Sequence, residues 1–334
     1  MASTYKDIQE MTGLSLSTIS KYFNGGNVLA SNRRAIGGAA AALGFRVNEF
    51  ARGLRTACSR TVGVLLPELD SSFSTAIIAR VEEILRAHGY GMIICDCRGD
   101  TSGEAEAVDF LLGKMIDGLI AIPLGGDGAV FAPAAERGVP VVLIDRLAQG
   151  FTTDSVTVDN ANASRLAVDH LVEHGHRRIA IVSGPADIYT MRERLQGFRQ
   201  ALAEHGIEPS GGHVVPGDMT VDGGFAGMRQ LLDLADPPSA VFCVNYELTL
   251  GAVIALIETG TRFPESISLI GFDNLLLPRV VTPRPTMVVQ PISRIAEVAA
   301  DLLLERMAKN GPDLPRTIVL PTELVLGESV GTAQ

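Results

Sequence analysis

Short apolar runs alternate with helix-length amphipathic stretches from residue 61 onward. The stretch Thr75–His88 repeats apolar residues at helical spacing and stops before Gly89, whereas the short runs have the length of buried strands. This alternation predicts βαβ units with parallel sheets. It restarts near residue 178, which indicates two doubly wound lobes with a ligand cleft between them. The predicted strands are Thr61–Leu66, Met92–Cys95, Leu119–Ile122, Val139–Ile144, Arg178–Val182, Ala240–Val244 and Ser268–Gly271, and further predicted helices are Arg192–His205 and Leu248–Glu258.

One turn imitates a dinucleotide-binding fingerprint. Gly126 and Gly128 follow a predicted strand, and Asp145 lies about twenty residues further on. Phe131, however, occupies the third glycine position, where only a small residue lets the helix pack against the strand. We therefore expect no nucleotide cofactor at this turn.

The N-terminal segment predicts a helix-turn-helix. Thr4 and Asp7 have the spacing of a capping box that opens a short helix, whose apolar face would include Ile8 and Met11. Gly13 then permits a tight turn into the next helix. We call residues 1–46 the head.

The second predicted helix spans Leu16–Phe23, with Ser15 as its N-cap and Ile19 packed on the first helix. A third helix over about Asn32–Leu43 closes the small core. A three-helix domain with a purely structural role is the alternative interpretation. The residues of the second helix that point away from the core, and can enter a major groove, are Leu16, Ser17, Ser20 and Lys21.

Charge is divided unevenly along the chain, whose net charge is −10. Residues 1–60 hold eight Lys and Arg against three Asp and Glu, or +5, which leaves 20 basic and 35 acidic residues, or −15, for the remainder. A basic head suits attraction to phosphates, and an acidic body suits solubility. With no apolar signal segment, no run of 18 apolar residues and only four cysteines, we expect a cytoplasmic protein.

Two motifs could suggest a metal site. Cys95 and Cys97 lie in an apolar strand-like run, where small buried thiols are expected. His174 and His176 flank Gly175 at the end of a predicted helix, where a helix C-cap and turn account for them. Neither motif has further ligands nearby in the sequence, and no catalytic triad, carboxylate pair or phosphate loop is evident. We expect no metal, no cofactor and no enzyme.

The segment Asn48–Arg55 joins head and body and is weakly amphipathic. Arg52 and Arg55 can meet phosphates, while Leu54 has no core of its own to enter. A solvated linker explains the same residues equally well.

Taken in order, these motifs resemble the lactose-repressor (LacI/GalR) family of bacterial regulators over about residues 4–330. The matching positions in the head and its linker are Asp7-Ile8, Gly13–Ser15, Thr18–Lys21, Asn24, Asn48, Ala51-Arg52 and Leu54. Those in the body are Val142–Arg146, Val158–Asn160, His170–Ala180, Arg194–Phe198, Asn245–Ala252 and Ile270–Asn274.

The resemblance implies an α/β protein: an all-α helix-turn-helix head on a two-lobed, periplasmic-binding-protein-like body of doubly wound parallel sheets. The implied domains are residues 1–46, a hinge at 47–60, a first lobe at 61–157 and 289–317, and a second lobe at 158–288 and 318–334. It also implies a homodimer on a pseudo-palindromic DNA operator, acting as a repressor whose small-molecule effector binds between the lobes. Paired hinge helices would wedge Leu54 into the minor groove, a known bending mechanism.

By position, Leu16, Ser17 and Lys21 fall where the family contacts bases. The full set of implied DNA-binding residues is Thr4, Tyr5, Ser15, Leu16, Ser17, Thr18, Ser20, Lys21, Asn24, Asn48, Arg52, Leu54 and Arg55.

The implied effector residues follow strand ends or begin helices, where a cleft ligand would lie. Arg194 and Asp273 supply hydrogen-bond donors and acceptors that suit a sugar, although family members that sense nucleobases use similar positions. Tyr246 replaces the family's usual aspartate, and its ring could either cover a ligand or plug the cleft. The implied set is Phe73, Asp145, Tyr189, Arg194, Asn245, Tyr246 and Asp273.

The head departs from the family pattern at several positions. Gln9 replaces a small alanine, and Leu29 replaces a serine cap, so Ser31 could cap the third helix instead. Gly37 and Gly38 lie within that helix and should each cost roughly 1 kcal/mol relative to alanine.

Two other classes of protein share parts of this pattern. A periplasmic sugar receptor would have the same body, but the basic head argues against it. A sugar kinase on doubly wound lobes would need a phosphate site and a general base, and neither is evident. No leucine-heptad tail follows the strand-like Glu323–Leu326, so we expect a dimer rather than a tetramer.

Overall fold

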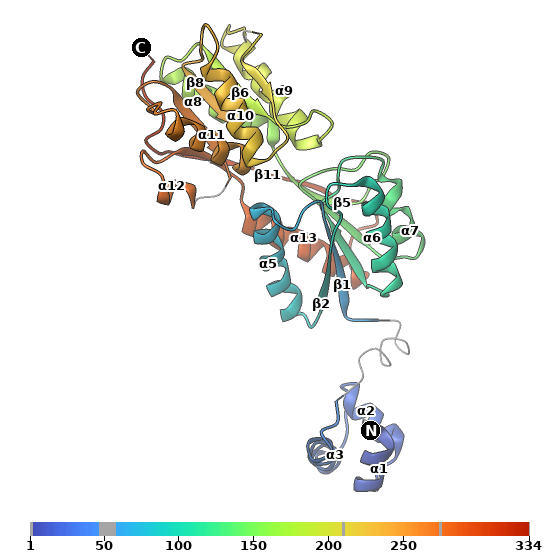
Figure 1. Ribbon diagram of the computed structural model, residues 1–334. Helices are drawn as coiled ribbons and strands as arrows, with labels where there is room; N and C mark the ends of the chain where they lie inside the picture. Colours follow the sequence, from blue (N-terminus) through green and yellow to red (C-terminus); the bar gives the residue numbers. More distant parts are fainter. Residues whose placement is uncertain (1–2, 47–57, 209–210, 274–275, 334) are drawn as a thin grey trace. The chain divides into compact units, whose positions relative to one another are not determined.

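A computed structural model describes residues 3–46, 58–208, 211–273 and 276–333 (Figure 1). The chain forms two compact units, Met1–Ser59 and Arg60–Gln334, each with its own core. The predicted hinge residues Asn48–Arg55 lie outside the described residues.

The small unit is built from three helices: α1 (Tyr5–Thr12), α2 (Leu16–Phe23) and α3 (Ala30–Ala42). Ile8, Ile19 and Ile36, one from each helix, are fully buried at its centre. Met11, expected on the apolar face of α1, is instead 58% exposed, and the contacts of α1 with the core come from Ile8 and Tyr5.

Helix caps explain where these helices begin. The Asp7 carboxylate accepts hydrogen bonds from the Thr4 backbone N–H (2.6 Å) and hydroxyl (2.9 Å), and these bonds lower the pKa of Asp7. The Ser15 hydroxyl accepts from the Thr18 N–H at 3.2 Å, as predicted for α2. The expectation that Ser31 caps α3 is wrong, because the helix starts at Ala30 with Leu29 at the N-cap.

The first sheet of the large unit has six parallel strands in the order β11-β5-β4-β3-β1-β2. Helices α5 and α13 pack on the core side formed by Val62, Val64 and Val142, while α6 and η1 pack with Leu65 and Leu143. The strands are β1 (Thr61–Leu66), β2 (Gly91–Asp96), β3 (Gly118–Ala121), β4 (Val141–Ile144), β5 (Asp154–Val158) and β11 (Thr317–Leu320). The helices are α5 (Ser72–Ala87), α6 (Thr101–Gly113), η1 (Gly128–Phe131), α7 (Ala132–Glu136) and α13 (Ile292–Met307).

The second sheet has the order β12-β10-β9-β8-β6-β7, with only β12 antiparallel to its neighbour. Helix α8 packs against α9, and α10 packs so closely on α11 that a Cβ at Gly251 would overlap the carbonyl of Val221. The strands are β6 (Ile179–Ser183), β7 (Val214–Pro216), β8 (Ala240–Cys243), β9 (Ser268–Phe272), β10 (Thr286–Val289) and β12 (Glu323–Val325). The helices are α8 (Asn160–Glu173), α9 (Tyr189–Glu204), α10 (Val221–Leu232), α11 (Tyr246–Glu258) and α12 (Leu277–Val280).

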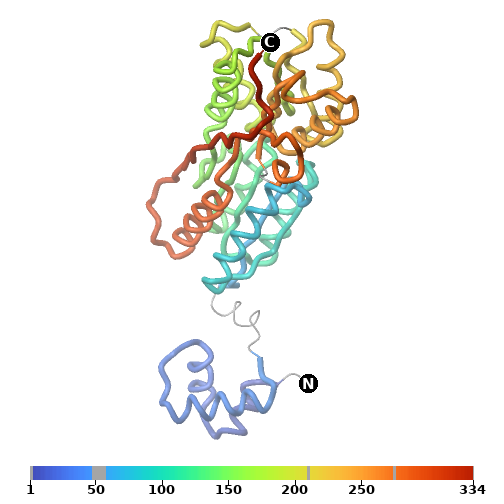
Figure 2. Tube along the Cα trace, turned by 90° about the vertical axis from the view of Figure 1, so that its left-hand side faces the viewer, coloured from blue at the N-terminus to red at the C-terminus, as the bar shows by residue number. Residues whose placement is uncertain are grey.

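The chain passes between the two lobes three times, after β5, β10 and β11. Figure 2 shows the last passage as the red segment that leaves the lobe of α13 and continues along the other lobe to the C-terminus. β5 ends at Val158, β10 at Val289 and β11 at Leu320, within one to three residues of the lobe boundaries expected at residues 157, 288 and 317.

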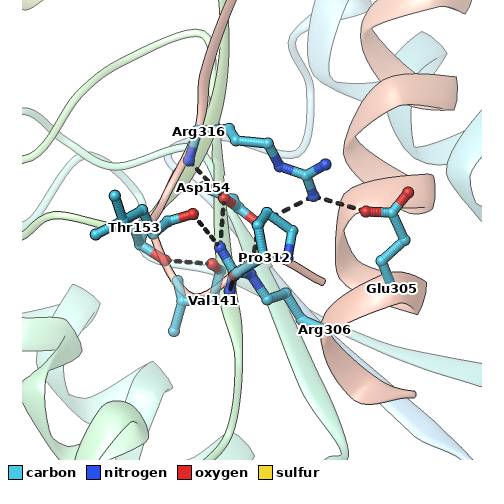
Figure 3. A network of polar contacts seen from close by, with 8 residues as sticks. Val141, Thr153, Asp154, Glu305, Arg306, Pro312 and Arg316 are labelled. Atoms are coloured by element: carbon cyan, nitrogen blue, oxygen red, sulfur yellow. Dashed lines mark hydrogen bonds and ion pairs between the residues drawn. The ribbon is translucent and has the colours of Figure 1, made fainter. Parts of the chain in front are cut away.

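A buried carboxylate ties together the elements where the first lobe is assembled from distant parts of the chain (Figure 3). The fully buried Asp154 side chain, at the start of β5, accepts from Arg306 Nε (2.8 Å) and Nη2 (3.0 Å) and from the Arg316 N–H (2.7 Å). Arg316 also pairs with Glu305 at 2.7 Å. The network therefore joins β5 to the end of α13 and the start of β11.

Among the described residues, no helix combines the length and the apolar character needed to cross a bilayer.

Candidate functional site

A cavity of about 460 Å³ lies between the two lobes of the large unit. Its lining comes from segments that follow the carboxyl ends of strands in both sheets, as doubly wound folds lead one to expect. Six of the seven predicted effector residues line it: Phe73, Asp145, Arg194, Asn245, Tyr246 and Asp273.

Asp273 follows β9 directly and is 6% exposed. Its Oδ2 accepts a hydrogen bond from Gln290 Nε2 at 2.9 Å, while its Oδ1 has no partner among the described residues. Burial raises the pKa of Asp273 to about 6, although the positive charge of Arg194 opposes that rise. The carboxylate is therefore held in the cavity wall with one oxygen available to a ligand.

Arg194 lies in the second turn of α9 and is 3% exposed. Its Nε donates to Asn160 Oδ1 (2.8 Å), its Nη1 donates to the Val244 carbonyl (2.6 Å), and the guanidinium lies 3.8 Å from the Phe272 ring centroid. Burial lowers the pKa of Arg194, and Asp273 and Asp145 counteract that effect. These contacts hold the Arg194 guanidinium in the buried wall of the cavity.

Asp145 follows β4 and has a left-handed backbone, with φ of 67°. Its Oδ2 lies 3.5 Å from Arg146 Nε, and Arg146 Nη1 donates to the Pro123 carbonyl at 3.4 Å. Both side chains are 8% exposed and line the cavity. The cleft thus contains two buried carboxylates and two buried guanidinium groups.

Asn245 is the N-cap of α11, which explains its place at the cavity wall. Its Oδ1 accepts from the Leu248 N–H at 2.8 Å, and its Nδ2 donates to Glu247 Oε2 at 3.0 Å. Tyr246 and Phe73 are half-buried, line the cavity, and also pack against the cores of the second and first lobe respectively.

Tyr189 does not line this cavity. It borders a smaller one of about 200 Å³ together with Gly125, Leu147 and Arg192, whose guanidinium lies 5.7 Å from the centroid of its ring. Tyr189 is the first residue of α9, and its side chain borders the segment after β4 rather than the main cavity.

Several lining residues were missed by the sequence analysis. Gln290 follows β10 directly, so the rule that located Asp145 and Asp273 would have found it had β10 been recognised. Glu68, Asp218 and Glu247 also line the cavity, and each lies within a few residues of a strand end or helix start.

The motifs considered for metal binding have structural roles. Cys97 is buried, Cys95 is half-buried, and burial raises the pKa of both thiols. His176 is hydrogen-bonded to Ser239 Oγ (2.9 Å) and to the Gly331 carbonyl (3.0 Å), and His174 is the C-cap of α8. Among the described residues, no group of His, Cys, Asp and Glu side chains could hold a metal ion.

In the head, α2 exposes Leu16, Ser17 and Lys21, the three residues implied to contact bases. Other predicted DNA-binding residues bond to one another: Ser15 Oγ to Thr18 Oγ1 at 2.9 Å, and Asn24 Nδ2 to Ser20 Oγ at 3.2 Å.

The two residues that begin α1 are also engaged within the head. Thr4 bonds to Asp7, and the Tyr5 ring stacks on Phe23 with centroids 5.4 Å apart, in a cluster that includes Phe45. Asn48, Arg52, Leu54 and Arg55 lie outside the described residues.

Comparisons with known proteins cover the whole chain. A family model described as a periplasmic binding protein-like domain matches residues 168–330. The repressor CytR of Escherichia coli strain K12 is 33% identical and covers 92% of this chain and 90% of its own length. The structure of the lac repressor dimer bound to operator and the anti-inducer ONPF has a TM-score of 0.90 at 26% identity, covering 99% and 100% of the two chains. The complex of the regulator CelR with cellobiose has a TM-score of 0.75 at 30% identity, covering 98% and 99%.

Proposed function

Since the chain belongs to the lactose-repressor (LacI/GalR) family of bacterial transcriptional regulators, we propose that it represses transcription by binding an operator through its head, under the control of a small polar effector in the cleft. It is a transcriptional regulator and not an enzyme, since relatives such as CytR, PurR and a ribose operon repressor are repressors. The observation that carries the effector proposal is the buried, charged cleft with an unpartnered carboxylate oxygen on Asp273.

On DNA, α2 would enter the major groove and Lys21 would donate to a base edge, with Leu16 and Ser17 beside it. This proposal is supported by their exposure and by the core residues Ile8, Ile19 and Ile36, which fix α2 against its neighbours. The hydrogen bonds between Ser15 and Thr18 and between Asn24 and Ser20 would hold the N-terminal and C-terminal ends of α2 respectively.

We assign the hinge role to Asn48–Arg55 on the family resemblance alone. Two hinge segments would pair on the operator, with Arg52 and Arg55 near phosphates and Leu54 inserted into the minor groove. Such pairing requires two copies of the chain, so the functional unit is a homodimer, as in the lac repressor dimer bound to operator. A regulator that acts on DNA in a bacterial cell works in the cytoplasm.

We propose a sugar or a related molecule as the effector. The cleft offers Asp145 and Asp273 as acceptors and the two buried guanidinium groups as donors, a combination that suits neighbouring hydroxyl groups. Relatives of this fold were solved with cellobiose and with ribose.

Selection of preferred sites from random DNA, followed by mobility-shift titration, tests the operator proposal. We expect a pseudo-palindromic site, and Lys21→Ala should weaken binding to it by roughly 1–3 kcal/mol and relax the preference at one position of each half-site. Lys6→Ala, which removes an exposed cation from α1, should weaken selected and unrelated DNA alike.

Equal losses on all DNA for Lys21→Ala would make Lys21 a phosphate contact and overturn its assignment. Protein that selects no site at all would instead favour a sugar receptor without DNA binding. The same titration on Leu54→Ala tests the hinge, since removal of the wedge should lower operator affinity and leave ligand affinity in DNA-free protein unchanged.

A further inference from the structure

We propose that the cleft selects ligands that carry no negative charge and present hydrogen-bond donors to Asp273 and Gln290, and that it rejects phosphorylated forms of the same molecules. The inference rests on the proposed function, because it assumes that the effector binds in this cleft. It adds the chemical class of that effector.

Two buried acceptors in the cavity wall lack donors. Asp273 Oδ1 and Gln290 Oε1, on side chains 6% and 4% exposed, have no hydrogen-bond partner among the described residues. Gln290 Nε2 donates to Asp273 Oδ2, so the two side chains form a pair whose free atoms are both oxygens. A buried acceptor without a donor destabilises the protein, and a hydroxyl or amine of a ligand can supply that donor. A phosphate dianion or a carboxylate offers only further acceptors.

Negative charge outweighs positive charge around the cavity. Its two cationic side chains are Arg146 and Arg194. Arg146 lies beside Asp145 and donates to the Pro123 carbonyl, although its buried Nε has no hydrogen-bond partner among the described residues. Arg194 donates to Asn160 and to the Val244 carbonyl. Its six carboxylic acids are Glu68, Asp145, Asp187, Asp218, Glu247 and Asp273. An anionic ligand would therefore meet an excess of like charge among the lining residues described, because carboxylates outnumber guanidinium groups by six to two.

Like charges also face one another across the cleft. Glu68 follows β1 of the first lobe, whereas Glu247 lies in the first turn of α11 in the second lobe. Burial raises the pKa of Glu247, and the negative charges of Glu68 and Asp70 raise it further, so these groups interact across the gap between the lobes. A phosphate placed between them would be repelled from both sides, whereas a neutral molecule would separate them.

Matched ligand pairs test this selectivity on the full-length protein. Calorimetric titration would use D-ribose with D-ribose 5-phosphate, D-glucose with D-glucose 6-phosphate, and adenosine with adenosine 5′-monophosphate. For every pair in which either member binds, the neutral member should bind at least about 100-fold more tightly. Repulsion between the phosphate and the nearby carboxylates is large enough for this difference in affinity. Tighter binding of a phosphorylated member, or binding by no neutral member, would overturn the inference.

Two variants, each of which removes one negative charge from α11, test which carboxylate excludes phosphorylated ligands. Glu247→Gln keeps an oxygen to accept from Asn245 and removes a charge at the cleft, whereas Glu258→Gln removes a charge from the exposed far end of the same helix. Glu247→Gln should strengthen binding of the phosphorylated member about threefold or more relative to its neutral partner, and Glu258→Gln should not.

Ligand binding that survives Asp273→Ala would place the effector elsewhere, and so contradict the proposed function itself. A preference for the phosphorylated member that Asp273→Ala abolishes would keep the cleft as the effector site and overturn only the inference of charge selectivity.

Discussion

Asp273 combines three properties that conflict in a protein without ligand. It is almost fully buried, it has one carboxylate oxygen without a partner among the described residues, and its backbone is left-handed, with φ of 58°. Each of these costs free energy in the empty protein, and a ligand that donates to Oδ1 offsets part of that cost. The residue is therefore placed for binding at the expense of stability.

The pH dependence of the unfolding free energy of Asp273→Asn tests this balance between binding and stability. The pKa of Asp273 is raised to about 6 in the folded protein, whereas it is near 4 in the unfolded chain. The contribution of this group to the free energy of unfolding is therefore fully present below about pH 4 and is lost as pH rises through about 6. The variant has no such group, so relative to wild type it should gain about 2–3 kcal/mol in unfolding free energy between pH 4 and pH 7.5, while losing ligand affinity. Denaturant titration of ligand-free protein at several pH values measures this difference.

The exposed substitution Asp301→Asn in α13 is the control, since it removes the same charge from the surface of the large unit. If the difference in unfolding free energy between wild type and Asp273→Asn does not change between pH 4 and pH 7.5, Asp273 titrates normally and the burial argument fails.

At the scale of elements, hydrophobic patterning was sufficient for most strands that consist of a continuous apolar run. β1, β3, β4, β8 and β9 lie where the apolar runs predicted them. β5 was not recognised, because it contains Asp154, Ser155 and Thr157 beside two valines, although its position between two strands buries every residue. The four-residue strand β10 was also missed. Tertiary burial, which a single sequence does not reveal, decides such strands.

The candidate site was predictable to the same extent. Residues placed by strand ends, such as Asp145 and Asp273, could be found from the sequence, whereas Gln290 was missed together with β10. Arg194 was assigned through the family resemblance, and its bonds to Asn160 and Val244 depend on contacts between α9, α8 and β8 that no local pattern encodes. Tyr189 was misplaced because the start of α9, at Tyr189 rather than Arg192, sets the direction of its side chain.

Gly37 and Gly38 lower the stability of helix α3. A Cβ at Gly38 would meet no atom within 4 Å, so Gly38→Ala should stabilise the head by about 1 kcal/mol through helix propensity alone. At Gly37 the new Cβ would lie 3.3 Å from the Tyr22 hydroxyl, and Gly37→Ala should gain less. Hydrogen exchange of the α3 amides in the full chain should slow about fivefold for Gly38→Ala. Equal slowing by both variants would show that the Tyr22 contact is unimportant.

The Asp154 network should contribute more to stability than the surface ion pairs of the first lobe. Burial raises the pKa of Asp154, but its hydrogen bonds to Arg306 and Arg316 outweigh that effect and leave the pKa below its ordinary value. Its contribution is therefore present at neutral pH and is lost as pH falls through the lowered pKa. Asp154→Asn should cost about 2 kcal/mol at pH 7, because it weakens the charge-assisted hydrogen bonds that the fully buried carboxylate accepts from Arg306 and Arg316, whose side chains are partly exposed.

Glu297→Gln is the matched control on α13, since Glu297 pairs with Arg80 where both side chains are about one-third exposed. It should cost less than about 1 kcal/mol. Chemical denaturation of both variants at pH 7 and pH 4 gives the comparison, and similar costs at pH 7 would show that Asp154 is not a stabilising centre.

At the scale of the whole molecule, the head and the large unit have separate cores, so we expect them to unfold in separate transitions. The core of the head, with Ile8, Ile19 and Ile36, shares no residue with the cores of the large unit. Differential scanning calorimetry should show two transitions. A cleft ligand at a hundred times its Kd should stabilise the large unit by about 2.7 kcal/mol, and operator DNA should raise the transition temperature of the head. Gly38→Ala should move only the transition of the head. One transition that every ligand shifts together would mean that the two units unfold as one.

The three passages between the lobes also fix an order of events during synthesis. The first lobe contains β1 to β5 from early in the chain, but its helix α13 and edge strand β11 come from residues 292–320, after almost the entire second lobe. Until those residues emerge from the ribosome, the apolar side chains of Val142, Ile144 and Val156 lack the helix that covers them. The second lobe can be nearly assembled on the ribosome while the first still exposes this surface. Nascent chains that stop before residue 292 should therefore bind holding chaperones through the first lobe, and residues 292–320 then complete the lobe that was begun first.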